Sequence, residues 1–480
     1  MIRPKAGRET RARATLEVAI RDPLEAVRAL AHLPYPFLLH TPLQHRRARW
    51  SFFGADPFAV FRGDDYGQAI ALWESISVRA ASATGARDEP PFRGGVVGYW
   101  AYDFGRRLER LPALAADDLR LPDVLLGFYD VVGAFDHATG RARLFSSGLP
   151  LDDPHRAHRA CERLERFARL LRPPGPTALP LPPRGAQTTC ARSTFSPESY
   201  RRAVEQVKEH IRAGDIFQAN LSQRWSLALP AADPCERALA LQQSIARVSP
   251  APFSAFFAAP DHAVASASPE GFLELRSRRV ETRPIKGTRP RAAERSEDAR
   301  LEAELLASEK DRAENVMIVD VLRNDLGRVC ETGSVRATAL CELETFAQVH
   351  HLTSTVEGRL REGLGPFDLL HACFPGGSIT GAPKIRAMEI LEGLEPVRRH
   401  IYTGSLGYVD WSGDAEWNIA IRTALVTPRA IHFAAGGAIT ADSDPEAEYR
   451  ETLHKAEGLR AALEQVAGPV RLEPAPVAVP

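Results

Sequence analysis

A proline-rich stretch divides the chain and limits how it can fold. Residues 172–185 read RPPGPTALPLPPRG, with six prolines and two glycines. Because proline lacks the backbone N–H that a helix interior or a central strand needs, this stretch predicts an extended linker. We therefore expect a β-rich N-terminal region over 1–171, a linker over 172–186, a second domain over 187–467 and a disordered tail over 468–480.

Composition and charge exclude several classes of protein. Hydrophobic residues make up 44% and charged residues 25% of the 480 positions, as in an ordinary globular protein. Lys plus Arg equals Asp plus Glu at 61 each, so net charge predicts neither a nucleic-acid nor a membrane partner. No apolar run reaches transmembrane length, and none of the six cysteines forms a Cys-x-x-Cys pair. We expect a cytoplasmic protein without disulfides or zinc.

The N-terminal region has mostly strand signals. Residues 37–41 form a short strand candidate, and 121–135, a turn at 136–140 and 141–145 read as a hairpin. A helical pattern rich in arginine follows over 154–171.

The second domain opens with a well-marked helix and an alternating strand. Ser196 is the expected N-cap, Pro197 suits the first turn, and Gly214 is a stop signal. Residues 217–229 then alternate, with apolar side chains on one face and four polar ones on the other: Gln218, Asn220, Ser222 and Arg224. Such a polar face is usually solvated, but it carries little of the Lys or Glu typical of solvated faces, so it also fits a lined cavity.

Lys286 is the first candidate for chemistry. It lies in ETRPIKGTRPR, residues 281–291, after a strand-like run over 271–275. Gly287 permits a close backbone approach or a positive φ, and Thr288 adds a hydroxyl. A neutral lysine amine is a good nucleophile, although an isolated lysine at such a place is more often a solvated turn residue. We expect burial and the cations of Arg283, Arg289 and Arg291 to lower its pKa.

Carboxylates on two predicted helices form the second candidate. The stretch 310–328 has a helical pattern that places Glu314 beside its apolar side. A second helix over about 445–464 carries Glu448, Glu451 and Lys455 on one face. Converging carboxylates could hold one Mg²⁺, and the alternative is ordinary pairing along a surface helix.

Anion-binding features form the third candidate. Residues 374–386 make a glycine-rich loop before a helix with Pro383 in its first turn, where free N–H groups suit carboxylates or phosphates. The spacing is not that of a P-loop, and a tight structural turn is the alternative. A strand over 416–423 is expected to present Arg422 for a bidentate contact with a carboxylate, and 434–439 offers further amides. Alone, His351 and Glu270 are each more often structural than catalytic. The set suits a small, multiply anionic substrate.

These motifs, taken in order, resemble the chorismate-binding enzymes: anthranilate synthase component I, aminodeoxychorismate synthase component I, isochorismate synthase and salicylate synthase. The resemblance covers about 195–467 and extends to RGGVVGY at 93–99, which is similar to the extra subdomain of the first two enzymes. The matching motifs are GDIFQANLSQR at 214–224, SPE at 268–270, PIKGT at 284–288, DRAEN at 311–315, RND at 323–325, HL at 351–352, PGGSITGAPK at 375–384 and EYRET at 448–452. The fold implied is α+β, with two large antiparallel sheets packed as a sandwich and helices outside.

The resemblance also implies a branch of the family. Aminodeoxychorismate synthases usually have lysine where Lys286 stands, whereas the other branches usually have alanine. The water-adding enzymes typically place a lysine base where Gln218 stands, which argues against isochorismate chemistry. The activity implied is the conversion of chorismate and ammonia to 4-amino-4-deoxychorismate, on the route to 4-aminobenzoate and folate. Anthranilate synthesis is the main alternative, and a non-catalytic chorismate sensor is another.

The resemblance assigns roles to residues by motif position. Lys286 would be the nucleophile and Glu270 the general acid, with His351 close by and Mg²⁺ held by Glu314 and Glu451. The implied substrate contacts are Gly287, Thr288, Thr380, Tyr408, Arg422, Gly436, Gly437, Ala438 and Lys455. Ala438 replaces the usual glycine, which would be costly in left-handed backbone.

Two further expectations follow from the resemblance. No segment resembles a glutamine amidotransferase, so ammonia is expected from a separate glutaminase subunit. Some relatives bind tryptophan near the position of 37–41, but their usual Leu-Leu-Glu-Ser is absent here, so we expect no tryptophan feedback. Binding of tryptophan as a structural ligand stays open.

Overall fold

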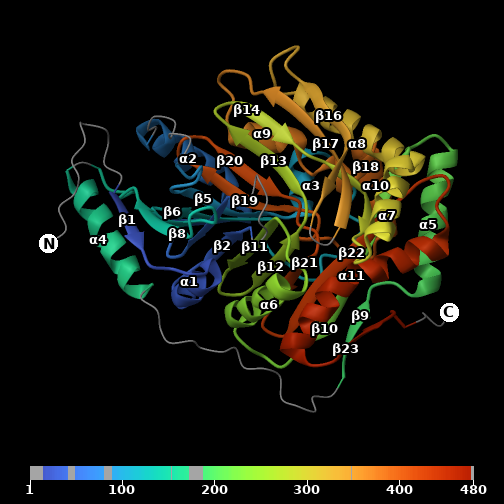
Figure 1. The fold of residues 1–480 in the computed structure, drawn as a ribbon, viewed down its shortest axis with the longest axis horizontal. Helices are drawn as coiled ribbons and strands as arrows, with labels where there is room; N and C mark the ends of the chain where they lie inside the picture. The colour runs from blue at the N-terminus through green and yellow to red at the C-terminus, as the bar shows by residue number, and fades with distance from the viewer. Residues whose placement is uncertain are drawn as a thin grey trace.

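Two large, mainly antiparallel sheets with helices around them make up the molecule (Figure 1). The computed structural model describes residues 14–41, 49–80, 89–152, 154–171, 188–346 and 349–476. The predicted linker over 172–186 lies outside the described residues. The predicted α+β sandwich is confirmed.

The first sheet contains thirteen strands among the described residues. In spatial order they are β1 (Ala14–Val18), β8 (Arg141–Ser146), β7 (Val131–Asp136), β3 (Trp50–Gly54), β2 (Phe37–His40), β11 (Phe253–Ala258), β12 (Ala263–Ser268), β21 (Thr423–Val426), β22 (Ala430–Ile439), β10 (Gln218–Ala228), β9 (Thr189–Ser193) and β23 (Val470–Glu473), with β18 (Gly381–Ala382) also pairing with β10.

The second sheet contains ten described strands. In spatial order they are β15 (Ile285–Pro290), β17 (Val349–Arg359), β14 (Arg279–Thr282), β13 (Gly271–Arg276), β20 (Ala415–Asn418), β19 (Ser405–Asp410), β5 (Gly95–Trp100), β6 (Val124–Tyr129) and β4 (Ala59–Arg62), with β16 (Arg336–Thr345) pairing with β17.

Four apolar clusters of described residues hold the layers together, and the smallest of them packs α5 (Pro197–Arg212) and α10 (Lys384–Leu394) against β10. One lies between the sheets and joins side chains such as Phe52 and Val132 of the first sheet to Tyr99 and Tyr408 of the second. A second cluster packs helices α1 (Pro23–Leu30), α4 (His155–Leu170), α6 (Pro234–Val248) and α11 (Pro445–Ala467) onto the first sheet. The third packs α2 (Tyr66–Ala80), α8 (Glu309–Gly327) and α9 (Pro366–Cys373) onto the second sheet. Burial of these apolar faces is the main driving force that orders the layers.

The predicted N-terminal region is not a separate layer. Its strands β1, β2, β3, β7 and β8 belong to the first sheet, and β4, β5 and β6 belong to the second. Both sheets are completed by strands that follow the linker. The boundary at 172–186 therefore divides the sequence but not the sheets.

The apolar run 121–135 is two strands rather than one. It breaks at Asp130, so that β6 joins the second sheet and β7 the first. The Asp130 carboxylate is buried and accepts hydrogen bonds from Arg163 at 2.9 and 3.1 Å, which satisfies the charge at the break. The predicted hairpin is confirmed for β7 and β8, with its turn at Asp136–Gly140.

Two other sequence expectations are wrong. Residues 416–423 do not form one strand, because β20 ends at Asn418 in one sheet and β21 begins at Thr423 in the other. The predicted tail also begins too early, because β23 pairs with β9 in parallel over 470–473. In both cases the partner strand is distant in sequence, so the local pattern did not show the pairing.

Helix ends follow their sequence signals closely. The side chain of Ser196 caps α5 (Pro197–Arg212) by accepting a hydrogen bond from the backbone of Ser199. Ser308 caps α8 and Asp444 caps α11 in the same way. These caps define where the helices that carry Glu314 and Glu451 begin.

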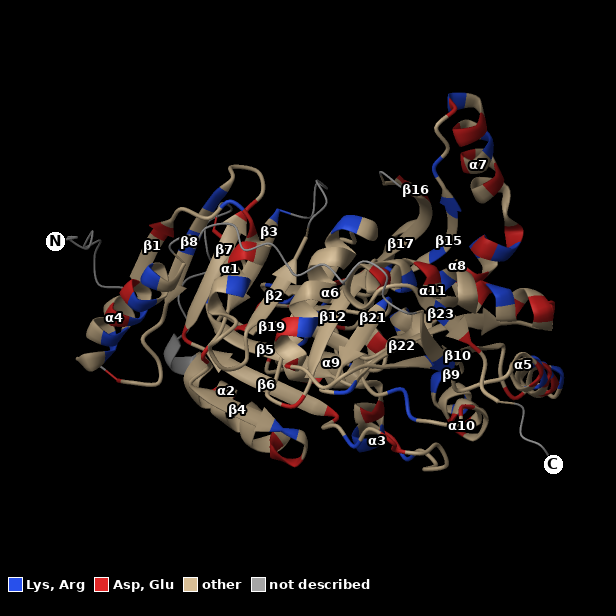
Figure 2. Cartoon of the chain, turned by 90° about the horizontal axis from the view of Figure 1, so that it is seen from below, with Lys and Arg blue, Asp and Glu red and all other residues tan. Residues whose placement is uncertain are grey.

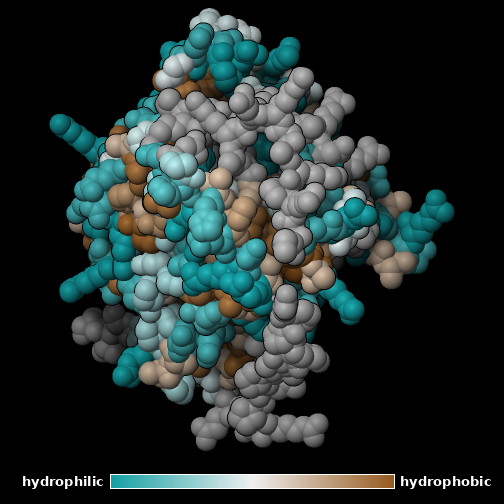
Figure 3. Space-filling view, turned by 90° about the vertical axis from the view of Figure 1, so that its left-hand side faces the viewer, coloured by the Kyte–Doolittle hydropathy of each residue, from teal (hydrophilic) through white to brown (hydrophobic). Residues whose placement is uncertain are grey.

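The surface is rich in charged side chains. Lysine, arginine, aspartate and glutamate side chains are interspersed along α4, α5, α7 (Arg295–Ala307) and α8 (Figure 2). On the end of the molecule seen in Figure 3, the described apolar residues form small groups between hydrophilic ones. Among the described helices, none combines the length and the apolar character that a bilayer crossing requires.

Candidate active site

A cavity of about 580 Å³ gathers most of the predicted site residues. It lies where the Lys286 strand β15, the first turns of α8, the strand β22 and the helix α11 meet. Its lining includes Lys286, Glu270, His351, Arg422 and Glu314. It also includes Gly287, Thr288, Gly436, Ala438, Glu451 and Lys455. Segments far apart in the sequence, from Glu270 to Lys455, thus face one space.

Lys286 projects into this cavity from a distorted strand. The pairing of β15 with β17 shifts register between Lys286 and Thr288, and Gly287 at this bulge has φ of 80°. A side chain at Gly287 would lie 2.9 Å from Asp311 and Leu305, so glycine is needed for conformation and for space. The Lys286 amine donates a hydrogen bond of 3.2 Å to the carbonyl of Ser378.

Burial lowers the pKa of Lys286 below that of an ordinary lysine. The carboxylates of Glu314 and Glu270 oppose this shift, and the ammonium of Lys455 adds to it. The expected contribution of three arginines is wrong, since each is engaged elsewhere. Arg283 pairs with Glu344, Arg289 with Glu304 and Arg291 with Asp298.

Glu270 lies across the same cavity as a buried carboxyl group. Its backbone is held by Ser268, whose hydroxyl accepts from the Glu270 N–H at 3.2 Å, and by Ile419, whose N–H donates to the Glu270 carbonyl at 3.0 Å. Burial raises the pKa of Glu270, and this effect outweighs the opposing hydrogen bond from Ser378 and the charge of Lys286. A carboxyl group whose pKa is raised can retain a proton to donate.

His351 is a neutral hydrogen-bonding group at this site. Burial, assisted by the charge of Arg422, lowers its pKa to about 4. Its Nδ1 lies 2.8 Å from the hydroxyl of Thr288 on the adjacent strand. The ring is therefore uncharged near pH 7 and is oriented by Thr288.

Arg422 is a half-buried cation in the cavity wall with no counterion among the described residues. Its guanidinium makes no hydrogen bond or ion pair with the described part of the protein, and burial alone lowers its pKa. Its φ of 48° is in the left-handed region, where a residue with a side chain is strained. An uncompensated guanidinium in a polar cavity provides a ready site for an anionic ligand.

An acidic group from two helices forms the opposite side of the cavity. Glu314 of α8 and Glu448 and Glu451 of α11 all line it. Burial raises the pKa of Glu314 and that of Glu448. For Glu451, burial would raise the pKa, but the Lys455 amine at 2.6 Å outweighs burial and lowers it. One oxygen of Glu448 is buried with no hydrogen-bond partner in the described structure.

Gly437 allows these carboxylates to approach the sheet. A Cβ at this position would lie 2.8 Å from Glu448 Oε2 and 3.5 Å from Glu451 Oε1. Among the described residues, no three acidic, histidine or cysteine side chains are arranged to hold a metal by themselves. An oxygen set of this kind nevertheless fits Mg²⁺, which usually takes one or two carboxylates and completes its shell with water and substrate oxygens.

The structure does not bring every predicted residue to the cavity surface. Tyr408 lines a different cavity, where its hydroxyl accepts a hydrogen bond of 2.8 Å from Arg276, so its expected substrate contact is wrong. Thr380 is fully buried and its hydroxyl donates to the Gly376 carbonyl at 3.0 Å, which is a role within the loop. Gly437 lies beneath the carboxylates rather than on the lining. Ala438 has ordinary strand backbone, so the expected left-handed strain does not arise.

Sequence reasoning missed several lining residues. Ser378 accepts from Lys286, and Asn220, Lys310 and Tyr402 also line the cavity. Ser378 lies within the glycine-rich motif, and Asn220 is on the polar face that alternation had singled out. Tyr402 carried no sequence signal, because it follows a turn after α10 (Lys384–Leu394).

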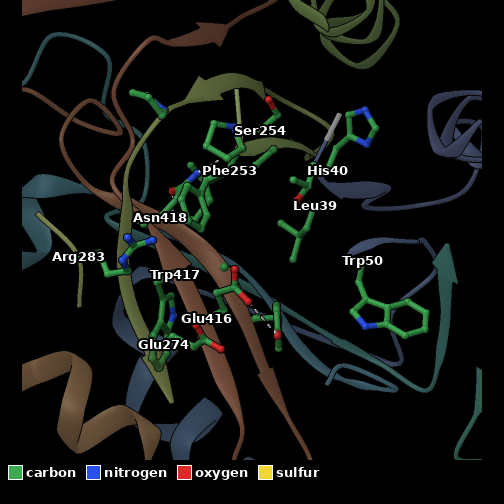
Figure 4. A pocket seen from close by; sticks show the side chains of 18 of the residues that line it. Leu39, His40, Trp50, Phe253, Ser254, Glu274, Arg283, Glu416, Trp417 and Asn418 are labelled. Carbon is green, nitrogen blue, oxygen red and sulfur yellow. Dashed lines mark hydrogen bonds between the residues drawn. The ribbon is translucent and has the colours of Figure 1, made fainter. Parts of the chain in front are cut away.

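A second cavity of about 360 Å³ adjoins the first and is shown in Figure 4. Leu39, Trp50 and Phe253 give it apolar walls, while Glu274 and Glu416 add carboxylates. Its lining includes His40 and Thr41, the positions at which the Leu-Leu-Glu-Ser pattern is absent. Arg276 pairs with Glu416 at 2.6 Å, so this carboxylate has its counterion within the cavity wall.

The fold and the first cavity define an enzyme for a small polyanionic substrate. A half-buried amine, a carboxyl group able to hold a proton, a guanidinium with no partner among the described residues and a group of acidic oxygens face one space. Residues 36–461 match the profile of the chorismate binding enzymes, and the chain belongs to this family.

Relatives of two activities cover most of the chain. The chain is 41% identical to aminodeoxychorismate synthase component 1 of Klebsiella aerogenes, over 89% of this chain and 93% of that protein. It is also 41% identical to anthranilate synthase component 1 of Thermus thermophilus, over 94% and 97% of the two chains. The Escherichia coli aminodeoxychorismate synthase component 1 is 38% identical over 91% and 95%. Overall identity therefore does not separate the two branches.

Solved structures support the same fold. Anthranilate synthase component I from Streptococcus pneumoniae superposes with a TM-score of 0.72 at 31% identity, over 87% of this chain and 93% of that one. The menaquinone-specific isochorismate synthase of Escherichia coli gives a TM-score of 0.70 at 20% identity, over 94% of each chain.

Proposed function

We propose that this chain is an aminodeoxychorismate synthase component 1, which converts chorismate and ammonia to 4-amino-4-deoxychorismate. The single observation that carries the proposal is the Lys286 amine, whose pKa is lowered by burial and which faces the cavity with Glu270. A lysine amine in that state is suited to covalent catalysis. The relatives of that name cover about nine-tenths of the chain.

In the first step, the neutral Lys286 amine attacks C2 of chorismate. The ring double bonds shift and the C4–oxygen bond breaks, while Glu270 donates its proton so that the hydroxyl leaves as water. Lys286 is then bonded to C2 as a secondary ammonium group, and Glu270 is a carboxylate. The raised pKa of Glu270 supports its role as the acid in this step.

In the second step, ammonia attacks C4 and expels Lys286 from C2. The C2–nitrogen bond breaks with its electron pair on Lys286, which leaves as a neutral amine. The new C4 ammonium group returns one proton to the Glu270 carboxylate. The net reaction exchanges the hydroxyl for an amino group and releases water, and both residues regain their starting states.

Arg422, Lys455 and the acidic side chains would position the substrate. Arg422 would bind one chorismate carboxylate, because its half-buried guanidinium lines the cavity and has no counterion in the part of the chain that the structure describes. Glu314 and Glu451 would hold Mg²⁺, with Glu448 beside them. When bound, the metal would orient the other carboxylate and balance the charge of the acidic side chains. Thr288 and His351 would form uncharged contacts with the substrate on the side of the cavity opposite the acidic side chains.

The ammonia is supplied by a separate glutaminase subunit in this proposal. The relatives are called component 1, which supports the existence of another component. We place the protein in the cytoplasm, where the six unpaired cysteines are compatible with a reducing environment.

Anthranilate synthase component I is the second candidate, since relatives with that name are equally similar overall. That reaction would add ammonia at the other ring position and eliminate pyruvate, and it leaves Lys286 without a covalent role.

The test is to incubate the purified protein with chorismate, Mg²⁺ and an ammonium salt and to identify the product by mass. Wild type is expected to yield a product that a 4-aminobenzoate-releasing lyase converts to 4-aminobenzoate, and Lys286→Ala is expected to lose most of it. A matched control is Lys208→Ala, because Lys208 binds the Ser443 carbonyl outside the cavity. Direct formation of anthranilate by both wild type and Lys286→Ala would overturn the proposal.

A further inference from the structure

The polar side chains that line the large cavity fall into two groups. Most of them have a partner within the protein, as the Lys286 amine has in the Ser378 carbonyl. In the part of the chain that the structure describes, the side chains of three lining residues have none: Asn220, Tyr402 and Arg422. Polar groups in such a position are normally satisfied by a ligand or by water, so each of the three is available to the substrates.

Asn220 faces the cavity because of its position on β10. Its neighbours Ala219 and Leu221 point to the other side of the strand, where they belong to the apolar cluster beneath α5. Asn220 therefore points away from α5, and it lines the cavity together with Ala438, its partner on β22. The residue is only 7% exposed, so its carboxamide is largely withdrawn from bulk solvent.

The backbone of Asn220 is held at both of its polar groups. Its N–H donates to the Thr380 carbonyl at 2.8 Å, and its carbonyl accepts from the Arg399 guanidinium. Arg399 also donates to the Ile379 carbonyl at 3.0 Å and to the Glu395 carboxylate at 2.8 Å. The backbone is thus fixed while the carboxamide has no partner of its own, which is the arrangement expected of a preorganised binding group.

The loop that holds Asn220 also contacts the proposed nucleophile and the proposed acid. The Ser378 carbonyl accepts from the Lys286 amine at 3.2 Å, and the Ser378 side chain forms a hydrogen bond with Glu270. Thr380, two residues later, provides the carbonyl that holds the Asn220 backbone. One short segment therefore fixes the amine, the carboxyl group and the carboxamide relative to one another, and all three line the same cavity.

A carboxamide suits a small uncharged partner. It has an acceptor oxygen and an NH₂ donor at fixed positions and carries no charge. In the proposed function, Arg422, Lys455 and the metal bind the chorismate carboxylates, and Glu270 protonates the C4 hydroxyl. Ammonia is the reacting group that these assignments leave without a partner. It has three N–H donors and one lone pair, so it can donate to a carbonyl oxygen and still direct its lone pair at carbon.

We propose that Asn220 binds the incoming ammonia, with its Oδ1 accepting one N–H, and so positions the nitrogen lone pair toward C4 of the substrate bonded to Lys286. The inference rests on the proposed function, which requires ammonia as the second substrate. Asn220 itself transfers no proton and forms no bond to carbon. After the attack, its Oδ1 accepts from the new C4 ammonium group until that group returns one proton to Glu270.

The test is Asn220→Leu, which has a similar shape but no hydrogen-bonding group. The purified chain is assayed with chorismate, Mg²⁺ and a series of ammonium chloride concentrations at one pH. The KM for ammonia is expected to rise about five- to ten-fold, as for the loss of one hydrogen bond. The KM for chorismate is expected to stay within two-fold of wild type. So is the rate at which the Lys286 adduct forms without ammonia, followed by rapid quenching and intact-protein mass.

Two variants serve as controls. Asn220→Asp keeps an acceptor oxygen in the same place, so its KM for ammonia is expected to stay within two-fold of wild type, although its charge should raise the KM for chorismate. Ser222→Ala changes the next polar residue on this face, whose hydroxyl donates to Glu395 at 2.8 Å, and is expected to change neither KM. Thermal melting establishes which variants are folded, and Asn220→Ala replaces Asn220→Leu if the leucine variant is not.

A KM for ammonia within two-fold of wild type in the folded Asn220→Leu protein would overturn the proposal. Equal slowing of adduct formation and of amination would also overturn it, because Asn220 would then act on chorismate or on the fold. So would a rise in Asn220→Asp as large as that in Asn220→Leu, since the acceptor is retained. Failure of the proposed function has a different signature, because wild type would then form neither the Lys286 adduct nor 4-amino-4-deoxychorismate.

Discussion

Replacement of Arg422 by glutamine is expected to lower kcat/KM for chorismate. It is expected to leave the free energy of unfolding of the ligand-free protein unchanged or slightly higher. The guanidinium is half-buried and has no counterion in the described structure, so the folded protein bears part of the cost of its desolvation until an anion binds. Hydrogen bonds to charged groups contribute about 1.5–3 kcal/mol each. The loss of a bidentate contact, partly replaced by the glutamine amide, is expected to cost about 3 kcal/mol, or roughly 150-fold in kcat/KM.

The sign of the stability change distinguishes a binding role from a structural one. Arg422→Gln removes a half-buried charge that has no partner in the described structure, so we expect the free energy of unfolding to rise by about 0–1 kcal/mol. Arg163→Gln is the matched control, because Arg163 is a buried arginine paired with Asp130 and Asp56. We expect the control to lose about 3 kcal/mol of stability, since it leaves the buried Asp130 carboxylate with Arg159 at 3.8 Å in place of two direct hydrogen bonds, and to keep kcat/KM within two-fold.

The assay combines steady-state kinetics on chorismate, with ammonium chloride as the nitrogen source, and urea unfolding without ligands. A loss of stability in Arg422→Gln comparable with that in Arg163→Gln would refute the reasoning. So would a kcat/KM within three-fold of wild type, because the substrate would then make no strong contact with Arg422.

Three further predictions concern the lysine, the metal and the second cavity. Because burial lowers the pKa of Lys286 below 10.5, the free energy of unfolding of the wild type should rise as pH increases from the folded-state pKa toward 10.5. Lys286→Met should lack this rise and should be the more stable protein at pH 7. Urea unfolding of both proteins at pH 7 and pH 10 is the test, and an equal change in the two would contradict the prediction. Glu314→Gln and Glu451→Gln should each raise the Mg²⁺ concentration for half-maximal activity at least ten-fold, and a magnesium titration of Glu457→Gln is the control. If either variant keeps the wild-type Mg²⁺ requirement, the carboxylate replaced in that variant is not a metal ligand. Tryptophan should not inhibit at micromolar concentrations, and a clear decrease in initial rate on adding it would show this prediction to be wrong.

Much of the local structure could be predicted from the sequence. Ser196 and Pro197 indicated the start of α5, because capping depends on neighbouring residues. Gly287 was expected to have a positive φ or a close approach, and it has both. The acidic residues were correctly placed on helices, since helical periodicity is itself local.

The sheets were harder to predict in detail because strand pairing is non-local. The run 121–135 gave one continuous apolar signal, yet its halves belong to different sheets on either side of Asp130. The strand β23 was expected to be part of a tail, because its partner β9 lies about 280 positions earlier. Neither outcome follows from composition or alternation within the segment.

By itself, the sequence determined which groups the site could contain: an amine beside Gly287, carboxylates on helix faces, and a polar face on β10. Tertiary structure decided which of them meet. It directed Tyr408 to the second cavity and Tyr402 to the first, and it left Arg422 half-buried with no counterion among the described residues while pairing the arginines around Lys286. The physical reason is that residue type and periodicity are properties of short segments, whereas desolvation and ion pairing depend on side chains that the fold brings together from distant parts of the chain.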